Sequence, residues 1–169
     1  MKKLVSLLII TLLAINCSFA QKKDKKEKKM SEQELKIAQG VATKMFEEDL
    51  VIYMTSLVSN YGRVALDGAK VSLKGDKFSC ELPYQGDSRI MTYGSQNITV
   101  KATNAPVEIE STFNEKKDYY KLNFTFESEH DNELFNVTLK IFLSGKVTLE
   151  LGSSRRESVT YSGGLYIEL

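Results

Sequence analysis

The sequence predicts a mainly β domain, an antiparallel barrel or sandwich of about nine to eleven strands that follows one N-terminal amphipathic helix. Three observations support this prediction. Apolar residues recur with helical spacing before Asp49, and with a period of two after it. Turn dipeptides separate the alternating runs. A lipocalin-like closed barrel is one architecture that such a series of short strands forms.

The N-terminal residues 1–20 have the pattern of a secretory signal peptide. Lys2 and Lys3 precede an apolar run at 4–15, whose length of about 12 residues is short for a membrane span. Small residues follow at Ser18 and Ala20. We therefore expect cleavage after Ala20 and an exported protein, periplasmic or associated with the cell envelope, with no transmembrane span in its mature form.

Cys17 leaves a second mode of export open, because a lipoprotein signal places a cysteine directly after its apolar run. Asn16 precedes it where a small residue is expected, so simple cleavage is favoured over a lipid anchor at Cys17. Residues 21–30 are charged and rich in lysine, which predicts a flexible linker. Residues 31–169 then form a single β-rich domain.

The charge balance argues against nucleic acid as a partner. The whole chain has 23 basic and 22 acidic residues, but eight of the lysines and only two of the acids precede Met30. The part from Met30 onward keeps 15 basic and 20 acidic residues, a formal charge of −5. A domain with a net negative charge lacks the positive field that attracts a phosphate backbone.

The predicted helix begins at a capping box, in which Ser31 and Glu34 each satisfy an unpaired backbone amide of the first turn. Apolar residues then recur between Leu35 and Phe46 at helical spacing, with Val41 near the middle. We expect this apolar stripe to pack on the core of the domain.

The strands after Asp49 have one apolar and one polar face, as half-buried antiparallel strands do. The predicted inward residues are Tyr120, Leu122, Phe124, Phe126, Phe135, Val137, Leu139, Ile141, Val147, Leu149 and Leu151. Turns are expected at Gly75-Asp76, Asp131-Asn132 and Ser144-Gly145.

The sequence has few residues of the kinds that catalyse reactions or bind metals. Cys80 and the single histidine, His130, are the one thiol–imidazole pair that the mature chain could form. Cys80 alternates with Phe78 and Leu82, which predicts a buried thiol that behaves as a small apolar group. His130 lies in an acidic turn without the glycine and the ligand spacing of a calcium loop. We expect no enzyme activity, no catalytic residue, no metal and no cofactor.

The stretch Leu82-Pro83-Tyr84-Gln85-Gly86 is predicted to be the corner that ends a strand. Pro83 cannot donate to a strand ladder. Tyr84 can pack its ring and still find a partner for its hydroxyl. Gly86 is expected to let the chain turn through a conformation that other residues avoid.

Three motifs together carry a resemblance to a known family. They are LPYxG at 82–86, SGKVTL at 144–149 and SSRRxxVTYxG at 153–163. With these motifs the chain resembles the family catalogued as domain of unknown function 4251, small exported proteins of Bacteroides-like Gram-negative bacteria. The resemblance covers about residues 35–168, and implies export and a compact β-rich domain without an assigned activity.

The absence of catalytic groups and the many inward aromatic residues favour non-catalytic binding of a small apolar or amphipathic ligand, as in lipocalin-like folds. The alternative is a structural or interaction module with an envelope protein as partner. The family motifs and the expected rim positions give Tyr84, Arg89, Arg155 and Tyr161 as candidate ligand-binding residues.

Overall fold

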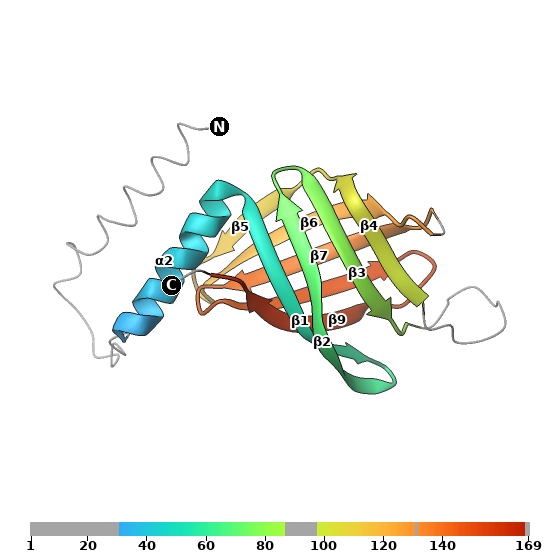
Figure 1. The fold of residues 1–169 in the computed structure, drawn as a ribbon, viewed down its shortest axis with the longest axis horizontal. Helices are drawn as coiled ribbons and strands as arrows, with labels where there is room; N and C mark the ends of the chain where they lie inside the picture. The colour runs from blue at the N-terminus through green and yellow to red at the C-terminus, as the bar shows by residue number, and fades with distance from the viewer. Residues whose placement is uncertain (1–30, 87–97, 131, 168–169) are drawn as a thin grey trace.

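The computed structural model describes residues 31–86, 98–130 and 132–167, which form one helix and nine strands (Figure 1). The predicted signal peptide and linker lie outside these residues. The elements are α2 (Glu32–Glu47), β1 (Asp49–Ser59), β2 (Gly62–Lys74), β3 (Lys77–Tyr84), β4 (Ile98–Pro106), β5 (Glu110–Asn114), β6 (Tyr119–Glu127), β7 (Leu134–Phe142), β8 (Lys146–Ser153) and β9 (Val159–Leu165). The predicted mainly β class with one preceding helix is confirmed. In the part of the chain described, no helix is long and apolar enough to cross a membrane.

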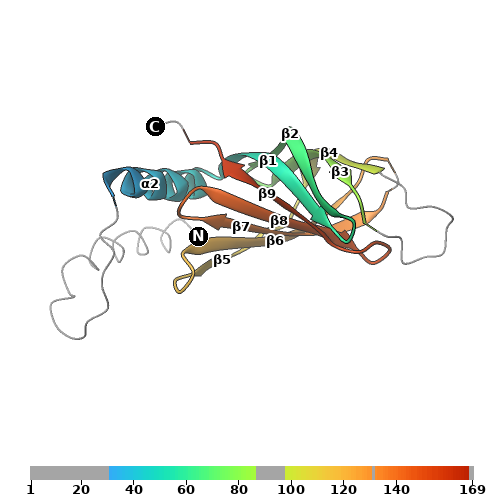
Figure 2. The ribbon, with the colours of Figure 1, turned by 90° about the horizontal axis from the view of Figure 1, so that it is seen from below.

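All nine strands belong to one antiparallel sheet, in the order β4-β3-β2-β1-β9-β8-β7-β6-β5. Strands that are adjacent in sequence are neighbours in the sheet, with one exception: β4 and β5 lie at its opposite edges. The pairing of β1 with β9 joins the two halves. The sheet curls so that β1–β4 face β5–β8 (Figures 1 and 2). The architecture is therefore a curled half-barrel, where the sequence had left barrel and sandwich open.

The inner face is set by the period of two along the strands. One row of cross-strand partners runs Leu122, Leu139, Leu149, Tyr161 and Leu57 over five consecutive strands, and every member is buried. Burying one such apolar side chain stabilises the fold by about 1.5–3 kcal/mol. The predicted inward residues of β6, β7 and β8 are buried, except that Tyr120 is only half-buried.

Five aromatic rings fill the space between β3 and the strands β6 and β7. Phe78 contacts both Phe124 and Phe126, with ring centroids 4.9 Å apart in each case. Phe126 lies 5.8 Å from Phe135, which lies 5.7 Å from the ring of Tyr84. These contacts bridge the two facing halves of the sheet, so the inner face between them is occupied by side chains. We call these five residues the ring chain.

The helix α2 lies at one end of the half-barrel (Figure 2). Ser31 and Glu34 form the predicted capping box, and Val41 is fully buried. Leu35 and Phe46 are 49% and 61% exposed, so the prediction that the whole apolar stripe packs on the core is wrong at both ends. One face of this amphipathic helix packs on the core, from Ile37 in its second turn to Met45 in its last, and the two exposed residues lie outside that face.

Two of the predicted turns depend on glycine. Gly75 lies between β2 and β3, and Gly145 between β7 and β8, with φ of 58° and 78°. Other residues avoid this left-handed region because their Cβ atom collides with the backbone. The third predicted turn also separates two strands, β6 and β7, and there Asn132 has φ of 50°.

Candidate functional site

Three of the predicted site residues, Tyr84, Arg155 and Tyr161, lie at one end of the half-barrel, which we call the loop end. It consists of the β1–β2 turn (60–61), the end of β3 (82–86), the described residues of the β6–β7 loop (128–130 and 132–133) and the β8–β9 loop (154–158). The β8–β9 loop contacts the other three segments. The asparagine of the β1–β2 turn, Asn60, donates a side-chain hydrogen bond to the Glu157 carboxylate. The loop end is therefore held together through one segment.

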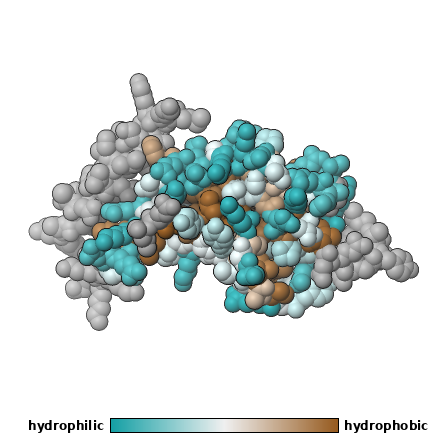
Figure 3. Space-filling model, viewed as in Figure 1, coloured by the Kyte–Doolittle hydropathy of each residue, from teal (hydrophilic) through white to brown (hydrophobic). Residues whose placement is uncertain are grey.

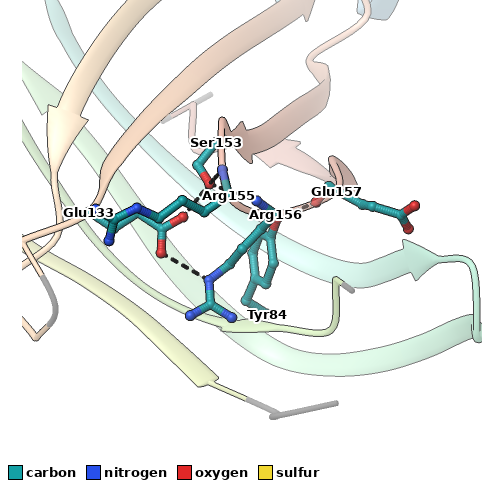
Figure 4. Close-up of polar contacts among 6 residues, drawn as sticks. All are labelled: Tyr84, Glu133, Ser153, Arg155, Arg156 and Glu157. Carbon is teal, nitrogen blue, oxygen red and sulfur yellow. Dashed lines mark hydrogen bonds and ion pairs between the residues drawn. The ribbon is translucent and has the colours of Figure 1, made fainter. Parts of the chain in front are cut away.

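Tyr84 holds the end of β3 against this loop (Figure 4), and Gly86 follows it in the chain. Tyr84 is fully buried, and its hydroxyl donates to the carbonyl oxygen of Glu157. A Cβ atom on Gly86 would lie 2.7 Å from that oxygen and 2.6 Å from the Tyr84 ring. Gly86 has no positive φ, so the predicted reason for this glycine is wrong. The glycine is required because the β8–β9 loop passes directly over it.

Tyr161 makes the reciprocal contact from β9. Its hydroxyl donates to the carbonyl oxygen of Pro83 over 2.8 Å. Burial raises the pKa of Tyr161 above its usual value, and the nearby Tyr84 and Cys80 add to the shift. The phenol therefore stays protonated and keeps its donor role at any physiological pH.

A partly buried ion pair fixes the β8–β9 loop to the β6–β7 loop (Figure 4). The Arg156 Nε atom lies 3.0 Å from Glu133 Oε2, and the two side chains are 17% and 4% exposed. Ser153 donates its hydroxyl to the other carboxylate oxygen of Glu133. The same Ser153 Oγ accepts from the backbone amides of Arg155 and Arg156 at 3.1 and 3.0 Å. This arrangement satisfies both oxygens of the carboxylate, as a buried charge requires.

An open pocket of about 290 Å³ lies at the opposite end, where α2 meets the β7–β8 turn and the end of β9. We call it the helix-end pocket. Its apolar lining comes from Ile37 of α2 and from Leu165 and Ile167. Gly163 and Gly164 line it without side chains, and a Cβ atom on Gly164 would meet only the Gly145 carbonyl oxygen, at 3.8 Å. Ser144 and Lys146, both exposed, are the polar residues of the lining.

Comparison with known proteins gives the family of the chain. The model of the family described as "Domain of unknown function (DUF4251)" matches residues 19–165. The chain belongs to the DUF4251 family. Its fold is similar to the crystal structure of a DUF4251 family protein from Bacteroides eggerthii DSM 20697, with a TM-score of 0.58 and 11% identity over 78% of this chain and 87% of that one. Comparison with curated protein sequences gives no match.

Two of the three motifs that carry the resemblance meet in this DUF4251 domain. The LPYxG motif supplies Tyr84 and Gly86, and the SSRRxxVTYxG motif supplies Ser153, Arg156 and Tyr161. The hydroxyl of each tyrosine donates a hydrogen bond to a backbone carbonyl oxygen of the other motif. The motifs therefore account for the way the loop end is closed.

The predicted site residues of the DUF4251 domain have different environments. Tyr84 and Tyr161 are buried with bonded hydroxyls, whereas Arg155 is exposed on the β8–β9 loop. Arg89 lies outside the described residues. Sequence reasoning missed Glu133 and Arg156, because Glu133 is one of several acids in its loop and Arg156 directly follows another arginine. No local pattern in the sequence distinguishes Glu133 from the other acids of its loop, or Arg156 from the more exposed arginine before it.

The predicted burial of Cys80 is confirmed. Its thiol is in the core, and burial raises its pKa to about 12, with the Ala102 backbone hydrogen bond opposing part of the shift. A thiol with so high a pKa supplies almost no thiolate nucleophile. His130 is exposed on the β6–β7 loop. Among the described residues, no group of three His, Cys, Asp or Glu is placed to hold a metal ion.

Proposed function

We propose that this DUF4251 protein is an exported, non-catalytic domain that binds a small amphipathic ligand in the helix-end pocket. The pocket carries the proposal, because its volume of about 290 Å³ is near the lower end of the range for ligand sites. Its lining is largely apolar, with two polar side chains, Ser144 and Lys146, as ligand pockets in general have.

The packing of the inner face supports a site at the end of the half-barrel. The ring chain occupies the space between β3 and β6–β7, and its member rings lie 4.9–5.8 Å apart. A ligand at that place would have to displace close-packed side chains at a cost of several kcal/mol, roughly that of emptying a core position. The helix-end pocket requires no such displacement.

The non-catalytic part of the proposal is supported by the thiol. Cys80 is buried with its pKa raised to about 12, so it is poorly suited to nucleophilic chemistry. The Tyr84 and Tyr161 hydroxyls are engaged with backbone carbonyl oxygens. The thiol and the two hydroxyls therefore have structural roles, in the core and in bonds between segments of the fold.

Native mass spectrometry tests the proposal on the purified protein mixed with a panel of small amphipathic compounds. At least one compound is expected to form an adduct with the wild type and not with Gly164→Val, whose side chain enters the pocket. Tyr166→Phe, an exposed change on the chain after β9, is the control and is expected to keep the adduct. Adducts that survive Gly164→Val, or none with any compound, would contradict the proposal.

Export is tested separately by the N-terminus of the protein that accumulates in a Gram-negative host. Cleavage after Ala20 gives a mature chain that begins at Gln21, and its intact mass shows this directly. A lipid on Cys17 would add the mass of its acyl chains. A chain that keeps Met1 would contradict cleavage after Ala20.

A second candidate function, an interaction module of the envelope, is favoured by the β1–β2 hairpin. Val58, Tyr61 and Val64 are 36%, 60% and 39% exposed near its tip, and brown atoms gather near the lower edge of Figure 3, where Figure 1 places this hairpin. Exposed apolar groups of this kind mark contact surfaces for other proteins. A photocrosslinker at Tyr61 should join one discrete envelope protein, and the same group at Phe113 should not. Equal crosslinking from both positions would count against this candidate.

A further inference from the structure

We infer that the ligand of the helix-end pocket is a small amphipathic carboxylate, with its apolar end against Ile37 and Ile167 and its carboxylate at Lys146. The inference rests on the proposed function, because it names the ligand class of the same pocket. It depends on two properties of the lining, its apolar shape and its charge.

The apolar part of the pocket is formed by side chains from segments far apart in sequence. Ile37 is in the second turn of α2, and Ile167 follows β9; both are partly buried against the core. Their methyl groups approach the same turn, because a Cβ atom on Gly145 would lie 3.4 Å from Ile37 and 3.8 Å from Ile167. Gly164 adds no side chain to this lining, and a Cβ atom on it would have only the Gly145 carbonyl oxygen within 4 Å. An open pocket of about 290 Å³ with this lining offers apolar contact to a short hydrocarbon chain.

The polar part of the pocket favours a single negative charge. Lys146 is exposed, and it makes no ion pair with any residue that the structure describes. Neither aspartate nor glutamate lines the pocket. Ser144, two residues before Lys146, adds a hydroxyl donor. One ammonium and one hydroxyl match a carboxylate, whereas a phosphate dianion would keep an unpaired charge.

Isothermal titration with decanoate and with decanol tests the charge. The two probes share a hydrocarbon chain and differ in the head group. Wild type is expected to bind decanoate more tightly than decanol, and Lys146→Met to raise the Kd for decanoate by about five-fold while leaving that for decanol unchanged. Lys70→Met, an exposed lysine on β2 outside the pocket, is the matched control and should change neither.

The outcomes separate the inference from the proposed function. Equal binding of both probes, unchanged in Lys146→Met, would overturn the inference and leave the proposed function standing. Binding of neither probe would overturn the inference, and the native mass spectrometry panel decides the proposed function independently. Gly164→Val should abolish decanoate binding; if that variant is unfolded, the smaller Gly164→Ala should still weaken it, and unchanged binding in a folded pocket variant would overturn the inference.

Discussion

The Tyr161 hydroxyl donates a 2.8 Å hydrogen bond to the carbonyl oxygen of Pro83, a residue 78 positions earlier in the chain. Tyr84, next to Pro83, donates its own hydroxyl to the carbonyl oxygen of Glu157, just before β9. Since β3 and β9 are not neighbours in the sheet, these two bonds cross the curl. They tie together the two halves that the β1–β9 pairing joins at its centre.

Tyr161→Phe should lower the free energy of unfolding by about 1–3 kcal/mol, because the Pro83 carbonyl oxygen loses its buried donor. Urea denaturation measures the change. Tyr166→Phe, which removes a hydroxyl from a half-exposed ring, is the control and should stay within about 0.5 kcal/mol of wild type. Equal effects of the two substitutions would contradict a role for the buried bond.

Gly86→Ala should destabilise the domain by about 1–3 kcal/mol, because its methyl group would lie 2.7 Å from the Glu157 carbonyl oxygen. Gly164→Ala is the matched control, since it has open space and no positive φ, and should be neutral or slightly stabilising. Thermal unfolding of the two variants distinguishes them. A Gly86→Ala protein as stable as wild type would show that the β8–β9 loop is not held at this distance.

Glu133→Gln should cost about 2–3 kcal/mol, because it removes the negative charge that faces the partly buried Arg156 guanidinium. The exposed pair Lys101–Glu129, at 3.9 Å and about two-fifths exposed on each side, provides the control. There Glu129→Gln should cost less than about 1 kcal/mol. Denaturant unfolding of both variants is the measurement, and similar losses would mean that burial does not strengthen the Glu133–Arg156 contact.

The Cys80 thiol should react with a thiol reagent such as DTNB only through unfolding. Because folding raises its pKa from 9.0 to about 12, the native state holds the neutral thiol, and the stability that this contributes declines as the pH rises from 9 towards 12. The test uses the Cys17→Ser variant, in which Cys80 is the single cysteine. At about pH 8, the rate at which Cys80 is labelled should follow the rate of unfolding or the population of the unfolded state. Labelling as fast as that of a free thiol in native conditions would contradict the burial.

The fold class could be predicted from the sequence because the side-chain period is local. The inward positions Phe135, Val137, Leu139 and Ile141 of β7 are all buried, as their alternation indicates. The pairing of β1 with β9 could not be predicted in the same way, since it joins distant segments whose local pattern fits several partners. Whether the sheet closes or stays open depends on such pairings.

The candidate sites were predictable to different degrees. Motif residues such as Tyr84 and Tyr161 were identified, but the sequence did not indicate that their hydroxyls would bond to backbone carbonyl oxygens across the curl. The helix-end pocket was missed, because it forms only where Ile37 of α2 and Ile167 approach the β7–β8 turn. No spacing along the chain brings these residues together, and their contact follows from the complete fold.

The most direct test of the proposed binding site is a two-dimensional amide NMR titration of the protein with decanoate. We expect the shifts to concentrate at Gly145, Gly164 and Leu165 and to saturate with the Kd from calorimetry, while the amides of the loop end stay unchanged. Shifts that centre on the loop end, or on the ring chain within the half-barrel, would contradict the helix-end pocket as the ligand site.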